Sequence, residues 1–429
     1  MIGIIMFVVA LAMLLFGFPV AFVFGGVALI FGVYAEGMDL FAFMPFRIQS
    51  IMENTILMAV PLFVFMGIVL QKTKLAEQLL ESMGTLFGGV KGGLAISTIL
   101  VGGLLAASTG VVGASVVAMG LIALPVMLKY NYDKKLASGV ICASGTLGQI
   151  IPPSVILIIL GDVMGVPVGD LFKAAVGPGL ILILAYVIYI LIYAHRNKHV
   201  APAISVELDE GDRAQQLKQA LFAILPPLAL MLVVLGSIFT GIATPTESSA
   251  LGGVGAILLA LMYRQFSWNM LFESSLETVK VTAMVFAILL GATAFSMTFT
   301  YTGGDTIVEE ALLGLPGEKM GFLILSMLVI MVLGFFIDFV EISFIIVPIL
   351  APVADALGVA PVWFAILIAM NLQTSFLTPP FGFSLFYLKG VAPPEIKTTD
   401  IYKGVVPFIL IQVAVVISIL LFPTMYGLQ

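Results

Sequence analysis

The amino-acid sequence predicts an all-α polytopic membrane protein in which two copies of one unit lie in opposite orientations. Three observations predict it: the composition, the recurrence of long apolar segments, and prolines repeated at constant spacing. Of the 429 residues, 61% are hydrophobic and 10% are charged, and the mean hydropathy is +1.20. Soluble domains carry about 25% charged residues. The composition therefore excludes a soluble globular protein and places the chain in a lipid bilayer.

Apolar segments of about 20 residues, long enough to cross a bilayer, recur from the first residues onward. The opening run MIGIIMFVVALAMLLFGFPVAF lacks the basic start and the clear cleavage site of a secretory signal, so we expect a retained helix. Hydropathy and Gly/Pro punctuation predict helices over these ranges: 2–16, 19–34, 55–71, 136–162, 175–194, 220–240, 246–262, 279–300, 361–388 and 404–425.

Two further apolar stretches, 92–128 and 320–354, are too long for a single crossing. Each is interrupted near its middle, the first by AASTGVVG at 106–113 and the second by GFFIDFVEIS at 334–343. Such a stretch is typical of a re-entrant helical hairpin, which enters and leaves the membrane on the same face. We therefore expect two re-entrant hairpins.

Consecutive prolines occupy equivalent places in the predicted helices 136–162 and 361–388. GTLGQIIPPS covers 145–154, and LTPPF is its counterpart near the end of the chain. Proline lacks an amide hydrogen, and the residue before it avoids the α region, so each helix must break or bend there. In lipid, a broken backbone is tolerated only where protein buries it or where it lines a watery cavity. We therefore expect two discontinuous helices, with functional breaks at Pro152, Pro153, Pro379 and Pro380.

The distribution of basic residues tests the hairpins, because Lys and Arg are enriched in cytoplasmic loops. Basic residues flank the first hairpin on both sides, and HRNKH at 195–199 lies two crossings further on. The segment 301–319 before the second hairpin is acidic and is expected outside. The loops predicted to be cytoplasmic contain Lys72, Lys74, Lys91, Lys129, Lys134, Lys135, Arg264, Lys280, Lys389, Lys397 and Lys403. The two hairpins are thus predicted to enter from opposite faces.

Proline landmarks recur in the same order in both halves of the chain. Pro19 and Pro245 are 226 positions apart, and both Pro125 with Pro352 and Pro152 with Pro379 are 227 apart. A duplication with opposite orientation is the inverted repeat of secondary transporters. The expected division is first-half scaffold helices at 1–91, first-half transport elements at 92–174, scaffold helices at 175–300 with a cytoplasmic linker at 195–218, second-half transport elements at 301–403, and a last helix at 404–429.

Each hairpin tip is expected to meet a broken helix near the membrane midplane. Broken half-helices direct amide hydrogens at anions and free carbonyls at cations. Unwound backbone together with Ser and Thr hydroxyls supplies sodium with oxygen ligands without a buried charge. The first predicted sodium site consists of Ser108, Thr109, Gly110, Thr146 and Gly148. The second consists of Asp338, Gln373, Thr374, Ser375 and Thr378.

Polar side chains at the same two places are candidates for the substrate. We expect Ser108, Ser144, Gln149 and Asp338 to contact it. Asp338 and Glu341 lie within an apolar stretch, where an ionisable residue is costly and usually lines a water-filled pathway. For both residues the alternative of a position in water at the outer end of the helix remains open.

Two further charged residues each have two possible roles. Glu247 in ATPTESSA either caps the helix that begins there or acts in transport. Arg47 lies in a segment expected outside and serves either the substrate or a partner protein.

Several function classes are excluded or disfavoured by absent motifs. No basic patch indicates nucleic acid. The single Cys142, which we interpret as a small apolar residue, excludes an intrachain disulfide and a CxxC site. No Walker A motif is present, and HRNKH lacks the glutamate of HExxH. An intramembrane protease would need GxSG with a His, or paired GxGD and YD motifs. We therefore expect no enzyme activity, no cofactor, and no metal other than sodium as the coupling ion.

Four motifs in order carry a resemblance to a known family. GTLGQIIPPS, LTPPFGFSLFYLKG, GIATPTESSALG and PILAPVADALGVAP resemble the large membrane subunit, of DctM or SiaM type, of tripartite ATP-independent periplasmic (TRAP) transporters. The similarity runs over essentially the whole chain. Many relatives have a serine-rich SGSS-like first hairpin tip, whereas this chain reads ASTGVVGAS. Because of this departure, we expect backbone carbonyls, more than side chains, to supply the sodium ligands at this tip.

The resemblance implies a function and partners. It implies a sodium-driven importer of organic acids in the bacterial inner membrane, which receives its substrate from a periplasmic binding protein. It also implies a separate small membrane subunit of four helices, and a transport domain that slides against a scaffold as an elevator. The main alternative is a stand-alone sodium/dicarboxylate-type symporter with similar hairpins. Such proteins carry an SNT triplet at each hairpin tip, which this sequence lacks.

Overall fold

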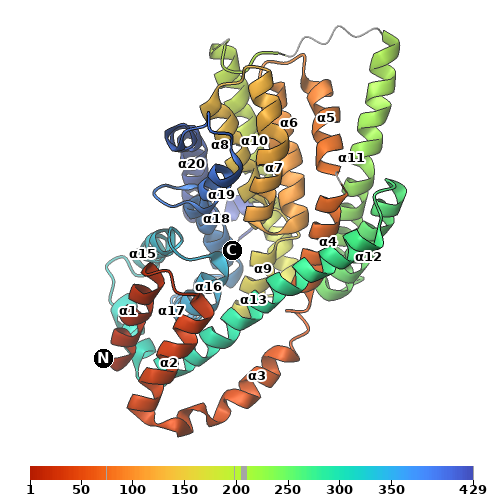
Figure 1. Cartoon of the computed structure of the whole chain (residues 1–429). Coiled ribbons are helices and arrows are strands. Elements are labelled where there is room, and N and C mark those ends of the chain that lie inside the picture. The colour runs from red at the N-terminus through yellow and green to blue at the C-terminus, as the bar shows by residue number, and fades with distance from the viewer. Residues whose placement is uncertain (74, 198, 204–209, 429) are drawn as a thin grey trace.

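The computed structural model describes residues 1–73, 75–197, 199–203 and 210–428, and in this part of the chain the regular structure is entirely helical. Seven of the described helices are long and apolar enough to cross a membrane, or eight if α4 and α5 count as one bent span. Five shorter apolar helices of 10–17 residues accompany them. The predicted all-α membrane fold is therefore confirmed (Figure 1).

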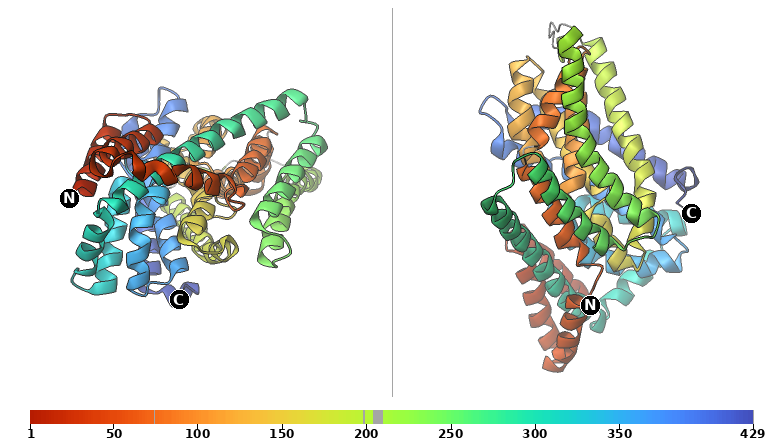
Figure 2. Two further views of the ribbon diagram at one scale, coloured as in Figure 1. Left: turned by 90° about the horizontal axis from the view of Figure 1, so that it is seen from below. Right: turned by 90° about the vertical axis from the view of Figure 1, so that its right-hand side faces the viewer.

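One group of helices forms a frame along one side of the molecule. Helix α13 packs against α2 and α4, and α12 packs against α4 and α11. Figure 1 shows α13 crossing the molecule obliquely from α12 to α2, and Figure 2 shows α11 and α12 side by side. We call this group the frame; it comprises α1 (Ile2–Leu15), α2 (Val20–Glu36), α4 (Ala59–Lys72), α11 (Glu210–Phe239), α12 (Pro245–Met262) and α13 (Trp268–Tyr301).

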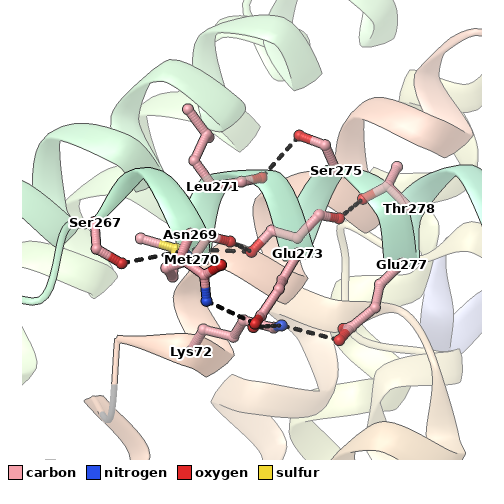
Figure 3. A network of polar contacts seen from close by, with 10 residues as sticks. Lys72, Ser267, Asn269, Met270, Leu271, Glu273, Ser275, Glu277 and Thr278 are labelled. Carbon is pink, nitrogen blue, oxygen red and sulfur yellow. Dashed lines mark hydrogen bonds and ion pairs between the residues drawn. The ribbon is translucent and has the colours of Figure 1, made fainter.

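A polar cluster joins two helices of the frame. The Lys72 ammonium lies 3.1 Å from a Glu273 carboxylate oxygen and 2.9 Å from one of Glu277 (Figure 3). Helix α13 begins beside this cluster, where the Ser267 hydroxyl accepts a hydrogen bond from the Met270 amide. The end of α4 is thereby held against the first turns of α13.

The remaining long helices form a second group, which we call the core bundle. Helix α8 packs against α6, α7 and α20, and α18 packs against α15, α20 and α9. Helix α10 packs on α6, α9, α18 and α20. The members are α6 (Gly93–Thr109), α7 (Val112–Lys129), α8 (Lys134–Thr146), α9 (Val155–Met164), α10 (Val168–Arg196), α15 (Glu318–Leu333), α16 (Phe339–Glu341), α17 (Val347–Ala356), α18 (Pro361–Leu377), α19 (Phe383–Val391) and α20 (Thr398–Leu421).

Two pairs of helices form the predicted hairpins. Hairpin 1 consists of α6 and α7, and hairpin 2 runs from α15 through α16 and a π-helical turn, Ile342–Ile346, to α17. The Leu94 amide at the start of hairpin 1 donates to the Tyr132 hydroxyl just beyond its end. The Lys319 ammonium at the start of hairpin 2 donates to the Gly358 carbonyl just beyond its end. Each hairpin therefore enters and leaves at one end of the molecule.

The two hairpins start from opposite ends of the molecule. Lys134, at the start of α8, donates to the Glu395 carbonyl, and the Asp133 amide donates to the Val200 carbonyl, so the basic loops meet at the end where hairpin 1 starts. Met164, at the far end of α9, lines one cavity with Asp355 at the base of hairpin 2. These contacts agree with the opposite entry expected from the basic residues.

Four short elements were not expected. Their residues lie outside the predicted spans, because these segments are too short or too polar to cross a bilayer. Helix α3 lies between α2 and α4 in the chain and touches η1 and α13 (Figure 1). Helix α5 packs between α6 and α11, and α14 packs against α13 and α17. They are η1 (Met38–Phe43), α3 (Met44–Met52), α5 (Leu75–Phe87) and α14 (Gly304–Leu313). Arg47 is exposed on α3.

The polar linker predicted at 195–218 is shorter than expected. Helix α10 continues to Arg196, and α11 already begins at Glu210. Residues 198 and 204–209 lie outside the described part of the chain. The difference arises because EGDRAQQLKQA contains mostly good helix formers, so the polar segment extends the apolar helix that follows it.

The alternative left open for Glu247 is resolved in favour of a cap. The Thr244 hydroxyl accepts a hydrogen bond from the Glu247 amide at 3.2 Å, and the Glu247 carboxylate accepts one from the Thr244 amide at 2.8 Å. This reciprocal pair is a capping box at the start of α12.

Candidate ion and substrate site

Hairpin 1 turns at Gly110. This residue has φ +64°, in the left-handed region that glycine adopts without steric cost. Ser108 and Thr109, in the last turn of α6, are both buried. The Thr109 hydroxyl lies 2.8 Å from the Ser115 hydroxyl on α7, which closes the tip. Ser115 was not among the predicted site residues, although its position in ASTGVVGAS marks it as part of the tip.

The first broken helix interrupts its backbone beside this tip. Helix α8 ends at Thr146, a short 3-10 turn η2 (Leu147–Gln149) follows, and α9 begins only at Val155. Pro152 and Pro153 lie in the interruption and are buried. We call residues 150–154 the first break. The predicted discontinuity is therefore present at the predicted prolines.

Glycines allow the tip and the first break to meet. A Cβ atom added to Gly148 would overlap the Ala106 carbonyl of α6. One added to Gly110 would lie 2.7 Å from a Val155 methyl carbon and 3.5 Å from the Val155 amide nitrogen at the start of α9. On the other side, a Cβ on Gly67 of α4 would overlap the Ser108 backbone. The tip of hairpin 1 therefore lies against both sides of the first break, at Gly148 and at Val155.

The second half repeats this arrangement. Helix α18 ends at Leu377, α19 begins at Phe383, and Pro379 and Pro380 lie between them in residues 378–382, the second break. A Cβ added to Gly334, at the turn of hairpin 2, would overlap the Ser375 hydroxyl of α18. The rings of Phe339 and Phe376 lie 6.3 Å apart. The tip of hairpin 2 therefore lies against the end of α18.

The hydroxyls at both breaks are bonded within their own helices. Thr146 donates to the Ala143 carbonyl at 2.9 Å and Ser144 to the Ile141 carbonyl at 3.0 Å. In the second half, Thr374, Ser375 and Thr378 donate to the carbonyls of Met370, Leu372 and Thr374 at 2.9, 2.8 and 2.7 Å. An oxygen that donates its proton in this way keeps lone pairs free to accept or to coordinate.

Of the three buried glutamines whose amide atoms have no hydrogen-bond partner within the described chain, Gln149 and Gln373 lie beside the breaks and Gln412 lies on α20. Both amide atoms of Gln149 and of Gln373 are unpaired within the described chain, and the two residues are 1% and 0% exposed. Buried polar groups are nearly always paired, so each exception calls for an explanation. Both residues were predicted for the site, Gln149 for the substrate and Gln373 for sodium. Their free amides mark polar space beside the two breaks.

Two carboxylates lie just beyond the turn of hairpin 2. Asp338 is the N-cap of α16, and its side chain accepts a hydrogen bond from the Phe339 amide at 2.7 Å. Glu341 is only 5% exposed, and its Oε2 atom has no partner. Within the described chain, ion pairs join Lys72 to Glu273 and Glu277 and Lys134 to Glu395, and none reaches Asp338 or Glu341. Because Glu341 is buried, the alternative that it lies in water at the outer end of its helix is wrong.

The two halves interlock through their broken helices. Helix α9 packs against α16, α17 and the π-helical turn of hairpin 2, and α19 packs against α7 and α8. Gly113, near the tip of hairpin 1, faces the Tyr387 ring of α19, where an added Cβ would approach to 2.8 Å. Tyr387 lies within electrostatic reach of both Asp338 and Glu341. Sequence reasoning missed Tyr387, although it belongs to the motif LTPPFGFSLFYLKG.

A cavity opens toward hairpin 1 at the end where the basic loops gather. Its volume is about 650 Å³, and it lies between α5 on one side and α6 and α7 on the other. Its lining includes the charged residues Glu77, Glu81 and Lys129. Apolar residues such as Leu94 and Leu121 line it as well.

Paired hairpins, broken helices and buried polar groups in a chain of membrane-spanning helices define a polytopic membrane permease. The fold resembles that of the YdaH transporter of Alcanivorax borkumensis, with a TM-score of 0.62 over 92% of this chain and 90% of that one. The two sequences are 14% identical, so this likeness concerns the fold alone.

Sequence comparison identifies the family. Residues 7–425 match the model of the DctM component of the tripartite ATP-independent periplasmic transporter, and the chain belongs to this family. It is therefore a multi-pass protein of the inner membrane, and its curated relatives are transport permeases.

Several curated relatives are similar over nearly the whole chain. The ectoine TRAP transporter large permease protein TeaC of Halomonas elongata is 29% identical, with 98% of this chain and 96% of that protein covered. The sialic acid TRAP transporter large permease protein SiaM of Vibrio cholerae is 28% identical, with 96% and 95% covered. The isethionate TRAP transporter permease protein DctMQ of Oleidesulfovibrio alaskensis is 30% identical over 94% of this chain, which spans 62% of that protein.

Proposed function

We propose that this chain is the permease subunit of a sodium-driven importer of organic acids. One observation carries the proposal: in each half, a hairpin tip lies against the break of a discontinuous helix, deep among apolar helices. Lipid tolerates broken backbone only where protein buries it or where it lines a polar cavity. Two such places related by an inverted repeat are where secondary transporters bind substrate and coupling ions.

The first tip and first break are proposed to form one sodium site. Carbonyl groups at the end of a helix have no partner further along the chain, and the negative end of the helix dipole favours a cation there. Ser108, Thr109, Gly110, Thr146 and Gly148 supply backbone carbonyls and hydroxyl oxygens for this site. Asp338, Gln373, Thr374, Ser375 and Thr378 supply the second. Substrate is proposed to bind between the sites, in contact with Ser108, Ser144, Gln149 and Asp338.

Transport is proposed to proceed as an elevator, with the core bundle moving against the frame. The moving part would take in α10 and α20 as well as the hairpins and broken helices, because both pack on the core bundle. The cavity between α5 and hairpin 1 lies at the end where basic loops gather, and such loops are cytoplasmic. It is the proposed route of release.

The family resemblance supplies the proposed partners. A periplasmic substrate-binding protein would deliver the organic acid, and a separate small membrane subunit of four helices would pack on the frame. The relatives described above are named for ectoine, sialic acid and isethionate. We propose substrates of that general kind, small polar organic acids.

The sodium gradient is sufficient for such work. One charge crossing about 100 mV gains about 2.3 kcal/mol, so two sodium ions gain roughly 4.6 kcal/mol before any concentration term. Since about 1.4 kcal/mol corresponds to tenfold, this supports accumulation by about 10³-fold for a substrate without net charge, when the net charge carried inward is that of the two sodium ions.

Uptake into proteoliposomes that contain the complete transporter tests the proposal. We expect uptake to require both sodium and the binding protein, and to stop when choline replaces sodium. Asp338→Asn should lower uptake at least about tenfold while leaving thermal unfolding unchanged, because Asn is as good an N-cap as Asp. Uptake that persists in choline would refute sodium coupling. Uptake without the binding protein would instead indicate a stand-alone symporter.

A further inference from the structure

The Glu341 carboxylate is more than a helix cap. It lies three residues after the N-cap Asp338, the spacing of a capping box, and the backbone amides of Asp338 and Glu341 donate hydrogen bonds to it. A capping role uses one oxygen of the side chain and is open equally to glutamine. The Oε2 atom remains buried and unpaired, so the charge of Glu341 needs a different explanation.

Further polar atoms and a change in helix geometry mark the same place. The Ser343 hydroxyl, two residues on, is fully buried and has no partner within the described chain. It lies in the π-helical turn Ile342–Ile346. Single π-helical turns inside α-helices are frequent at functional sites. These observations indicate an occupied polar site at the tip of hairpin 2 rather than a packing defect.

Aromatic rings accompany the two carboxylates. Tyr387 lies within electrostatic reach of Asp338 and Glu341 and is about one-third exposed. The rings of Phe336, in the turn of hairpin 2, and Phe381, in the second break, lie 5.5 Å apart, and both are exposed. Aromatic rings are among the groups with which proteins bind organic ammonium ions. Sodium instead requires several oxygen ligands.

We propose that Glu341 binds a positively charged nitrogen of the substrate, so that the transported acids are zwitterions that carry an ammonium or similar cationic group. Two carboxylates without a basic partner disfavour a simple dianion, whereas a zwitterion offers a cation to Glu341 and an anion to the sodium-loaded breaks. This inference rests on the proposed function and specifies its substrate class.

Matched pairs of small acids test the proposal directly. Taurine carries an ammonium group where isethionate has a hydroxyl, and aspartate carries one where succinate has a hydrogen atom. The purified full chain in sodium-containing nanodiscs is titrated with each compound, and binding is followed by the shift of its thermal unfolding. We expect the ammonium member of at least one pair to bind about tenfold more tightly than its partner. In Glu341→Gln, which keeps the cap, we expect this preference to disappear while the unfolding temperature without ligand stays unchanged.

A sodium titration of both proteins provides the control. We expect the sodium concentration that gives half-maximal stabilisation to be the same in the chain and in Glu341→Gln. A shift of about tenfold in that concentration would overturn the proposal, because Glu341 would then be a sodium ligand. Equal or tighter binding of isethionate and succinate, no response to either ammonium compound, or an unchanged preference in Glu341→Gln would also overturn it. In each of these cases, sodium-dependent uptake of plain anions would leave the importer function intact.

Discussion

Gly148 shows how a single residue controls the approach of hairpin 1 to the first break. An added Cβ would overlap the Ala106 carbonyl, a backbone atom that cannot move without displacing α6. Insertion of one carbon into a closely packed contact typically costs about 1–3 kcal/mol. We expect Gly148→Ala to lower the midpoint of thermal unfolding of the purified chain and to reduce sodium-dependent stabilisation.

Gly177 on α10 provides the matched control. It is exposed, and nothing lies within 4 Å of an added Cβ. Gly177→Ala should leave sodium-dependent stabilisation unchanged and should stabilise the helix slightly, since Ala is the better helix former by about 1 kcal/mol. Equal effects of the two substitutions would show that the contact at Gly148 is not tight.

At the scale of one element, α8 depends on its cap to place the first break. The Asp133 carboxylate accepts hydrogen bonds from the Lys135 and Leu136 amides, both at 3.0 Å. We expect Asp133→Ala to destabilise the chain by about 1 kcal/mol, the usual cost of losing an N-cap. The measurement is thermal unfolding in detergent. Asp133→Asn should remain close to the unmodified chain, and a loss as large as that of Asp133→Ala would implicate the charge rather than the cap.

The helical elements themselves were predictable to different degrees. The double prolines at 152–153 and 379–380 marked both breaks, because proline removes a backbone hydrogen bond locally. A double proline is not sufficient for a break, since α11 continues through Pro226 and Pro227. Helices α3, α5 and α14 were missed because hydropathy recognises only segments that cross the bilayer. Their helicity depends on packing at the ends of the molecule or on an interface, which local sequence does not reveal.

At the scale of the whole molecule, an elevator requires the core bundle to move past the frame. Leu104 of hairpin 1 and Met231 of α11 line the same small cavity between these two groups. We expect a short disulfide-containing thiol crosslinker between Leu104→Cys and Met231→Cys, in a Cys142→Ala background, to stop uptake by the complete transporter. Reduction should restore it. Full uptake by the crosslinked protein would show that hairpin 1 does not move against α11.

A crosslink within the frame serves as the comparison. Lys72 and Glu277 are 2.9 Å apart at their charged atoms and join α4 to α13 (Figure 3). The pair Lys72→Cys and Glu277→Cys, in the same background, should crosslink without loss of uptake. Exposed ion pairs contribute little stability, about 0–1 kcal/mol, so their removal should leave folding intact.

Most residues of the candidate site could be named from the sequence, but the contacts between them could not. Ser108, Thr146, Gln149, Asp338 and Gln373 were named because polar residues in apolar runs and proline breaks are local signals. Glu341 was left between two alternatives, because local sequence does not tell whether a carboxylate near a helix end is buried. Tyr387 was missed, since only the packing of α19 on α7 places it beside hairpin 1.

The sequence alone determined the membrane class, the two hairpins, the two breaks and the opposite entry of the hairpins, because hydropathy, proline geometry and the positions of lysines act within short segments. Tertiary structure alone decided that the Gly148 turn lies against Ala106 and that Glu341 is buried with a free oxygen. It also decided that α10 packs on hairpin 1 and α20 on the broken helices α8 and α18. These are relations between segments up to hundreds of residues apart. They depend on side-chain volumes that must fill one interior together, which no short stretch of sequence specifies.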